Sequence, residues 1–379
     1  MSEILQAWRK DLEFCKRCGL CMPICPTGIA NDWYQSKTPR GRMLLLYGLV
    51  NSELKPTKTL AERLHTCTLC GYCAVKCPSG LKLDEIFIDA RRALHSMGIK
   101  LPHLEEVSRR IKESGNPYDM PAEERFMWLD YGDEKPVFEG KAGLWVGCTL
   151  SYRRPETAAN VYSLLRKLMN VALVKEETCC GAPFYLAGDL NGLEEQLLKA
   201  IKVVERLGYE LLITPCPSCA RAFTEYAEKL GLDRGFDVEY LPVFLYKLLN
   251  EGKVPELSLN GLKVAYHDPC EAGRHMNIFD EPRAVIKAVK GIELLEMNGN
   301  RLFSNCCGGG GLYIALDSAK AVAIAERRLK DLPRDVNALV TACPSCEVNL
   351  SIAVANVGIE LEVLDVAEVW HRALSRLKS

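Results

Sequence analysis

Ser304-Asn-Cys-Cys-Gly-Gly-Gly-Gly311 is the stretch that decides the fold, because the chain contains a second version of it. The earlier version is Cys179-Cys180-Gly181, and Cys306 follows Cys179 by 127 residues. The same 127 residues separate Thr214-Pro-Cys-Pro-Ser-Cys219 from Thr341-Ala-Cys-Pro-Ser-Cys346. Two motifs repeated at one spacing predict two copies of one domain, related by a pseudo-two-fold axis.

Outside these motifs, the chain alternates short apolar runs with amphipathic segments. The pattern predicts strands at 143–147, 211–214, 262–267 and 338–341, and helices at 157–169, 194–207, 284–289 and 319–330. This alternation is typical of α/β domains with parallel sheets. We therefore expect a first copy at 141–260 and a second copy at 261–379.

The N-terminal part of the sequence has the pattern of helices and not of alternating strands and helices. Helical spacing predicts helices at 42–52, 59–64 and 83–97, the last ending at Gly98. We expect a helical domain at 1–98. Residues 99–140 are polar, interrupted by prolines and without cysteine, so they are interpreted as a linker.

All eighteen cysteines fall into four groups. A chain without an export signal keeps its thiols reduced, so many cysteines indicate metal binding or catalysis. The two N-terminal groups both read C-x2-C-x2-C-x3-C-P and consist of Cys15, Cys18, Cys21 and Cys25, and of Cys67, Cys70, Cys73 and Cys77.

This spacing is the ligand pattern of cubane [4Fe-4S] clusters of the bacterial ferredoxin type. The fourth cysteine of such a run binds the other cluster. Cys25 is therefore predicted to join Cys67, Cys70 and Cys73, and Cys77 to join Cys15, Cys18 and Cys21. Structural zinc is disfavoured, because zinc modules usually separate two C-x2-C pairs by a dozen or more residues.

The other two groups each combine a single cysteine, a double cysteine and a C-P-S-C element. They are Cys148, Cys179, Cys180, Cys216 and Cys219, and Cys270, Cys306, Cys307, Cys343 and Cys346. Several of these cysteines follow predicted strands, at the sheet edge where parallel α/β folds bind ligands. Five thiolates exceed the four that tetrahedral zinc uses, which favours an iron-sulfur cluster of unusual shape, although four of the five could still hold zinc.

The five-cysteine groups resemble the cysteine-rich CCG domain of the B-type and D-type polypeptides of heterodisulfide reductase, and of the iron-sulfur subunits of glycolate, lactate and glycerol-3-phosphate dehydrogenases. The ferredoxin runs in front give the layout of the D-type polypeptide. The resemblance implies a noncubane [4Fe-4S] cluster at one or both five-cysteine groups, with zinc as the alternative in one. It also implies catalysis at Cys270, Cys306 and Cys307, if a disulfide is the substrate.

One position departs from this family. Members that reduce the heterodisulfide tend to have histidine directly after the leading cysteine of the second motif, where this chain has Glu271. A carboxylic acid with a raised pKa could serve as the proton donor instead, and His267 and His275 flank the loop. Thr38-Pro-Arg-Gly-Arg42 resembles an element of the hydroxyacid-dehydrogenase relatives, and a plain helix start explains it equally well.

Three functions remain open. The leading hypothesis is an electron-transfer subunit that works with a flavoprotein dehydrogenase of the 2-hydroxyacid type or a membrane cytochrome. The second is a catalytic subunit that cleaves a heterodisulfide of the coenzyme M-coenzyme B type. The third is a scaffold without a redox role, stabilised by zinc or clusters.

Composition excludes several other classes. The net charge of −1 argues against nucleic-acid binding, and no apolar stretch has the length of a signal peptide or membrane span. We expect a cytoplasmic protein, associated with a membrane only through a partner. Gly308 to Gly311 lack the other parts of a nucleotide motif, so neither nucleotide nor flavin is expected. The four glycines also predict a more open C-terminal site than at Gly181-Ala-Pro-Phe184.

Overall fold

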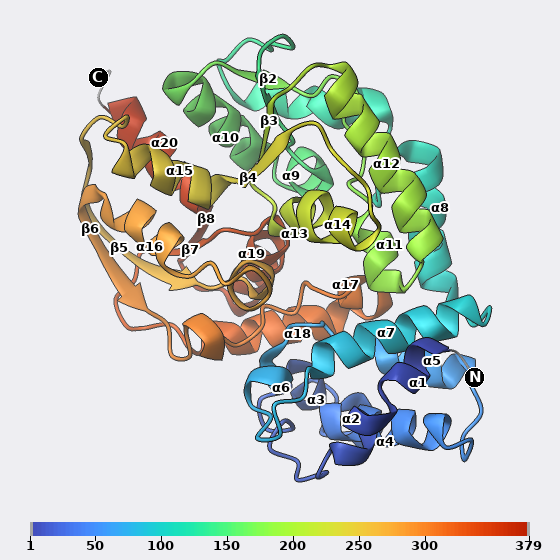
Figure 1. Cartoon of the computed structure of the whole chain (residues 1–379). Coiled ribbons are helices and arrows are strands. Elements are labelled where there is room, and N and C mark those ends of the chain that lie inside the picture. Colours follow the sequence, from blue (N-terminus) through green and yellow to red (C-terminus); the bar gives the residue numbers. More distant parts are fainter. Residues whose placement is uncertain (1–2, 377–379) are drawn as a thin grey trace.

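The computed structural model describes residues 3–376 and contains a helical domain and two α/β copies (Figure 1). The helical domain lies at the bottom of Figure 1, beneath both copies. Its elements are α1 (Glu3–Ala7), α2 (Arg9–Phe14), α3 (Pro26–Ile29), η1 (Gln35–Lys37), α4 (Pro39–Val50), α5 (Lys58–His65), α6 (Tyr72–Val75) and α7 (Leu83–Ser96).

Local sequence explains where these helices begin and end. Thr38 caps α4 by accepting a hydrogen bond from the Gly41 N–H, and Pro39 occupies the first turn, where a missing N–H costs nothing. Helix α7 ends just before Gly98, whose φ of 78° few other residues adopt readily. The predicted helices at 42–52, 59–64 and 83–97 therefore correspond to α4, α5 and α7.

The first copy contains a four-stranded parallel sheet with the order β2-β1-β3-β4. Its strands are β1 (Ala142–Leu144), β2 (Val171–Leu173), β3 (Leu211–Thr214) and β4 (Asp237–Tyr240). Its helical elements are α9 (Cys148–Arg153), α10 (Pro155–Leu168), α11 (Ala182–Ala187), α12 (Leu190–Arg206), α13 (Pro217–Arg221), η3 (Ala222–Tyr226), α14 (Ala227–Lys229) and α15 (Leu241–Asn250).

The second copy repeats this order as β6-β5-β7-β8, again all parallel. Its strands are β5 (Leu257–His267), β6 (Val289–Glu296), β7 (Ala338–Thr341) and β8 (Glu362–Asp365). Its helical elements are η4 (Glu271–His275), α16 (Asp280–Lys287), η5 (Arg301–Phe303), α17 (Tyr313–Leu316), α18 (Ser318–Leu329), α19 (Pro344–Val357) and α20 (Val366–Arg376). The predicted fold class, a helical dicluster domain followed by two duplicated α/β domains with parallel sheets, is confirmed.

The two copies pack reciprocally. The last helix of the first copy, α15, packs on α16 of the second, and the last helix of the second, α20, packs on α10 of the first. One apolar core continues across the contact and includes Leu144, Tyr266 and Trp370. Reciprocal packing of equivalent helices is what a pseudo-two-fold relation requires.

The segment 99–140 differs from the predicted linker. It contains helix α8 (Pro102–Ser114) and the 3₁₀ helix η2 (Ala122–Tyr131), and α8 packs against α11 and α17. Leu104, Val107 and Ile111 of α8 are buried, because they recur at helical spacing inside an otherwise polar segment. The segment is thus a structural part of both copies.

Candidate metal centres

The eight ferredoxin-type cysteines surround two separate pockets. One is lined by Cys67, Cys70 and Cys73 together with Cys25, and the other by Cys15, Cys18 and Cys21 together with Cys77. The fourth cysteine of each run therefore lies with the first three of the other run, as the spacing predicts. Cys25 is fixed at the start of α3, where its sulfur accepts a hydrogen bond from the Gly28 N–H at 3.3 Å.

These two pockets differ in exposure. All four cysteines of the Cys67 pocket are buried, whereas Cys18 is exposed and Cys15, Cys21 and Cys77 are half-buried. We call them the inner and outer ferredoxin sites. The inner site lies beside two fully buried arginines, since Arg42 lines its pocket and Arg91 donates to the Cys67 carbonyl oxygen at 2.6 Å. Burial lowers the pKa of Arg91 to about 10, which leaves its guanidinium charged at neutral pH.

The ten remaining cysteines lie at the carboxyl ends of the strands. Cys148 starts α9 after β1, Cys216 and Cys343 follow β3 and β7, and Cys270 follows β5. Nine of the ten line one continuous cavity of about 480 Å³ between the two copies: Cys148, Cys179, Cys180, Cys216 and Cys219 from the first, and Cys270, Cys307, Cys343 and Cys346 from the second. The two five-cysteine groups therefore face each other across a shared space.

The greater openness of the C-terminal site stays a prediction, because both groups line the same cavity. The cavity reaches all five cysteines of the first group and four of the second, while Cys306 lines a separate pocket. The four glycines are explained by close packing. A Cβ on Gly308 would lie 2.2 Å from the Ala321 carbonyl oxygen, and one on Gly311 would lie 2.5 Å from that of Cys67. Only glycine lets this loop approach the neighbouring backbone.

Through this glycine loop, the second group touches the inner ferredoxin site. The Cys306 sulfur lies 3.6 Å from the Thr68 hydroxyl, and Cys306, Cys70 and Tyr72 form one buried cluster with Cys270 packed against it. Arg91 joins the parts by also donating to the carbonyl oxygens of Leu186, in the first copy, and Gly311, in the second. The first group shares a large apolar cluster with Cys67 and Cys73, but among residues 3–376 no side-chain hydrogen bond joins it to the ferredoxin runs.

The first group has a different neighbour, the segment 99–140. Arg125 of η2 is buried and donates to Glu177 Oε1 at 2.8 Å and to the Cys148 sulfur at 3.4 Å. Glu177 in turn accepts hydrogen bonds from the N–H groups of Val146 and Gly147, just before Cys148. Sequence reasoning missed Arg125, because it lies in a segment interpreted as a linker.

The structure corrects the role predicted for Glu271. Its carboxylate forms an ion pair with Arg221 of the first copy. Burial, the largest single effect, would raise the pKa of Glu271, but the charge and hydrogen bond of Arg221 together with the nearby His275 hold this pKa below its ordinary value. A raised pKa for Glu271 is therefore wrong, and the group is a charged link between the copies.

The two histidines lie in different places. His267 is buried at the end of β5, within 4.8 Å of the sulfurs of Cys307 and Cys346. His275 faces the ferredoxin domain, where a ring nitrogen lies 2.9 Å from the Leu69 carbonyl oxygen. Only His267 adjoins the second cysteine group.

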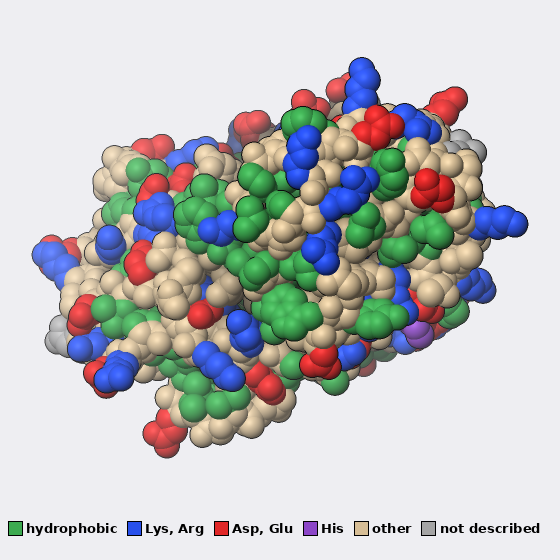
Figure 2. All heavy atoms as spheres, turned by 90° about the horizontal axis from the view of Figure 1, so that it is seen from below, with side chains coloured by type: hydrophobic (Ala, Val, Ile, Leu, Met, Phe, Trp, Pro, Cys, Tyr) green, Lys and Arg blue, Asp and Glu red, His purple; other side chains and the backbone are tan. Residues whose placement is uncertain are grey.

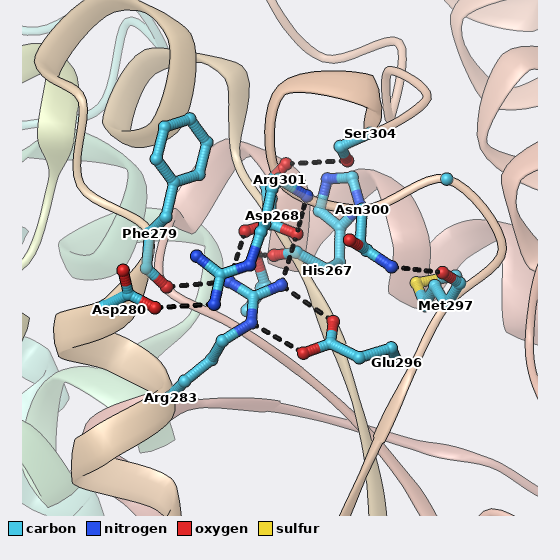
Figure 3. Close-up of polar contacts among 12 residues, drawn as sticks. His267, Asp268, Phe279, Asp280, Arg283, Glu296, Met297, Asn300, Arg301 and Ser304 are labelled. Carbon is cyan, nitrogen blue, oxygen red and sulfur yellow. Dashed lines mark hydrogen bonds and ion pairs between the residues drawn. The ribbon is translucent and has the colours of Figure 1, made fainter.

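An ion-pair network that the sequence did not reveal holds the loops of the second group (Figure 3). Arg283 forms two hydrogen bonds to Asp268, at 2.6 and 2.8 Å, and two to Glu296. Asp268 precedes Cys270 by two residues and also accepts from the Arg301 N–H, while Ser304 donates to the Asp268 carbonyl oxygen. The network thus ties the Cys270 loop to the loop that leads into Cys306.

The donors fit sulfur-ligated iron clusters. All eighteen cysteines are free, and none forms a disulfide, although the sulfurs of Cys307 and Cys346 are only 3.1 Å apart. In each double cysteine, the sulfur of the first residue accepts a backbone hydrogen bond. The Gly181 N–H donates to Cys179 at 3.5 Å, and the Gly308 N–H donates to Cys306 at 3.3 Å. Buried sulfur ligands with backbone donors are what iron-sulfur centres use.

The fold and these centres define a class, the cysteine-rich iron-sulfur proteins with a fused dicluster domain. Residues 142–224 and 264–351 match the family model for a cysteine-rich domain, CCG, and residues 11–81 match a 4Fe-4S dicluster domain. The chain is 31% identical over 388 residues to the D-type polypeptide of dihydromethanophenazine:CoB–CoM heterodisulfide reductase from Methanosarcina acetivorans, covering 96% of this chain and 94% of that protein. It therefore belongs to the family of D-type heterodisulfide reductase polypeptides, whose members are oxidoreductase subunits.

The chain is also similar to more distant relatives. The B-type polypeptide of the fumarate reductase (CoM/CoB) of Methanothermobacter marburgensis is 24% identical, over 97% of this chain and 73% of that protein. The probable glycolate oxidase iron-sulfur subunit of Bacillus subtilis is also 24% identical, over 93% of this chain and 91% of its own. A glutamate racemase from Bacillus anthracis aligns with a TM-score of 0.30 at 14% identity over 65% of this chain and 82% of its own, too low to bear on the fold.

Among the helices of residues 3–376, none combines the length and the apolar character that crossing a membrane demands.

Proposed function

We propose that the chain is an electron-transfer subunit in which the outer ferredoxin site receives electrons, the inner site relays them, and the cavity between the copies is their destination. One-electron carriers at these sites would be two cubane [4Fe-4S] clusters and one or two noncubane clusters at the five-cysteine groups. The observation that carries the proposal is the contact between Cys70 and Cys306 in one buried cluster. It supports the proposal because Cys70 belongs to the inner site and Cys306 to the second five-cysteine group.

The surface at the outer site fits a partner protein. Cys18 is exposed, and the large apolar side chains of Phe14 and Leu20 beside it are also more than half exposed. Lys16 and Arg17 line the same site. Figure 2, which views the molecule from the ferredoxin end, shows hydrophobic side chains across this face with lysines and arginines between them. A flavoprotein dehydrogenase of the 2-hydroxyacid type or a membrane cytochrome is the proposed partner, at the cytoplasmic side of the membrane.

A second function, cleavage of a disulfide in the cavity, is favoured by one observation. Both five-cysteine groups line the same cavity of about 480 Å³, within the range of volumes that small-molecule sites occupy. A substrate held there would face thiols of both copies at once. The proposed reacting side is that of Cys270 and Cys307, and Glu271 serves there as a fixed charge.

A third function, a scaffold with zinc in place of a noncubane cluster, draws support from His267. Its imidazole with Cys307 and Cys346 is a mixed nitrogen and sulfur set that zinc accepts. Metal analysis separates it from the other two. About sixteen irons and sixteen sulfides per chain, four clusters of four, support the redox functions, whereas about eight of each plus zinc support the scaffold.

Anaerobic purification tests the first two functions against each other. We expect a flavoprotein or cytochrome to copurify, and reduction of that partner to reduce the clusters of this chain. A new paramagnetic signal that forms when the oxidised protein meets a thiol would favour disulfide chemistry. If no partner transfers electrons and the thiol signal appears, the leading proposal is overturned.

A further inference from the structure

His267 presents one side of its ring to an arginine. Arg328 is fully buried, and its Nε donates to Nδ1 of His267 at 3.2 Å. Arginine can only donate hydrogen bonds, so Nδ1 must offer a lone pair. The imidazole proton is therefore on Nε2.

The same contact shows that the imidazole is neutral, because an imidazolium carries a proton on both nitrogens and could not accept at Nδ1. Since Nδ1 accepts from Arg328, only Nε2–H can donate a hydrogen bond on the other side of the ring. A ring nitrogen lies within 4.8 Å of the sulfurs of both Cys307 and Cys346. His267 is thus a fixed, uncharged N–H donor at the edge of the second five-cysteine group.

The first copy has a ring N–H at the equivalent position. Trp145 precedes Cys148 by three residues, just as His267 precedes Cys270. In the second sheet, His267 of β5 pairs with Thr341 of β7. In the first sheet, the last pair of β1 with β3 is Leu144 with Ile213. The next residues along the chain are Trp145 and Thr214, so Trp145 lies opposite Thr214. Thr214 and Thr341 are the first residues of the repeated T-x-C-P-S-C motif. The two rings therefore occupy the same place in the duplicated fold.

The indole of Trp145 is a buried donor without a partner. Trp145 has 0% exposure, and its N–H finds no hydrogen-bond partner among the described residues. Its ring packs edge-on against Phe223, 4.8 Å between centroids, inside the apolar cluster that contains all five cysteines of the first group. An unpartnered buried donor costs about 1–3 kcal/mol, so a ligand that accepts from it is expected.

We propose that this position is a duplicated hydrogen-bond donor to the metal centres. Nε2–H of His267 and Nε1–H of Trp145 each donate to a sulfur of the iron-sulfur centre in their own copy. Reduction makes a centre more negative, and a donor to its sulfur stabilises the reduced form, so each ring raises the reduction potential of its centre. This inference rests on the proposed clusters at the five-cysteine groups.

The unaltered protein provides the first test. Protein labelled with ¹⁵N-histidine and exchanged into D₂O is studied by pulsed EPR, with the second-copy centre in its paramagnetic state. We expect a weak ¹⁵N coupling and an exchangeable-proton coupling. In His267→Gln, whose amide also donates an N–H and accepts from Arg328, the ¹⁵N coupling disappears while the exchangeable-proton coupling remains.

Redox titration provides the second test. His267→Leu removes the donor and is expected to shift the oxidised-to-reduced equilibrium of the second centre about tenfold towards the oxidised form, about 59 mV for one electron. His267→Gln is expected to retain the potential. Trp145→Phe, which removes the N–H but keeps an aromatic ring, is expected to shift only the first centre.

The results separate this inference from the function on which it rests. With about eight irons per chain, the proposed clusters are absent and both fail. With about sixteen irons but no couplings in the unaltered protein, only the inference is overturned. Reduction potentials that stay unchanged in both Trp145→Phe and His267→Leu would likewise overturn the inference but not the proposed function. If His267→Leu does not fold, the couplings of the unaltered protein and of His267→Gln decide for the second copy.

Discussion

The two copies have the same sheet order and the same arrangement of five cysteines, yet their surroundings differ. The second copy packs its glycine loop on the inner ferredoxin site, whereas the first copy is covered by the segment 99–140 with Arg125 against Cys148. Duplication therefore supplies two similar five-cysteine groups, and under the proposed function the neighbouring elements decide which of them receives electrons. The second group is next to the inner ferredoxin site, and the first lies across the cavity.

The residues after the double cysteines show how this difference arose. In the first copy, Gly181 is followed by Ala182 and Pro183, which begin helix α11. In the second copy, Gly310 and Gly311 remain non-helical, and a Cβ on either would meet the backbone of the Cys67–Thr68 loop. A change of a few residues thus places glycine backbone, in place of a helix, against the ferredoxin domain.

The largest effect is expected from Gly311→Ala. Its φ of 63° and the 2.5 Å approach to the Cys67 carbonyl oxygen both oppose a side chain. We expect a loss of about 5 kcal/mol in unfolding free energy, measured by denaturant titration, because the loop must leave the ferredoxin domain.

Gly80→Ala is the matched control, since Gly80 has a φ of 66° but open space around its missing Cβ. It is expected to cost only about 1–2 kcal/mol, the strain of the left-handed conformation. Equal losses in both variants would show that packing on the ferredoxin domain contributes nothing at Gly311.

A smaller loss, specific to the first copy, is expected from Arg125→Met. It leaves the buried carboxylate of Glu177 without its cation, which costs about 3–5 kcal/mol. Cluster content, measured by EPR and iron analysis, should fall at the first centre while the second keeps its signal. The double variant Arg125→Met with Glu177→Gln should recover part of the stability, and a loss at the second centre instead would contradict the assignment.

The contact between the copies should depend on pH through Glu347. Glu347 accepts from Arg154 and Thr157 of the first copy, and burial raises its pKa to about 7, followed by the charge of Glu368. The folded state therefore binds a proton between about pH 4.5 and 7 that the unfolded state has lost, so stability falls as pH rises through this range. Glu347→Gln should remove about 3 kcal/mol of this dependence.

Unfolding at pH 5 and at pH 8 measures this effect. The unaltered protein should lose stability relative to Glu347→Gln on going to pH 8. An identical pH dependence in the two proteins would show that Glu347 is ionised throughout.

The smallest effect is expected from Glu271→Gln. It replaces a charged partner of Arg221 by a neutral one and keeps a hydrogen-bond acceptor, a loss of about 1 kcal/mol. Electron-transfer rates and their pH profile should be unchanged, because the pKa of Glu271 lies below its ordinary value. If the rate in Glu271→Gln no longer changed with pH on one side of the profile, Glu271 would be a proton donor after all.

Much of the fold followed from local sequence. Strands β3 and β7 match the predicted ranges residue for residue, and the grouping of Cys25 and Cys77 follows from the spacing of each run. These features depend on neighbours close in the chain. Strands β2, β4, β6 and β8 were not predicted. Of these, β2, β4 and β8 have only three or four residues, too few for alternation to distinguish them from loops.

The surroundings of the candidate site could not be predicted in the same way. The ionisation of Glu271 is set by Arg221, 50 residues away, and the tautomer of His267 by Arg328, 61 residues away. The shared cavity depends on how the copies pack, and the use of the glycines depends on the Cys67–Thr68 backbone. Such contacts join distant parts of the chain and leave no local pattern.

The position of Arg125 has a practical meaning for dissecting the molecule. A recombinant fragment starting at Lys141 would carry all five cysteines of the first copy, but not Arg125, nor the Gly115 carbonyl oxygen that accepts from the Cys179 N–H at 2.7 Å. The smallest portion that can be expressed or transplanted with its first centre intact therefore begins ahead of α8.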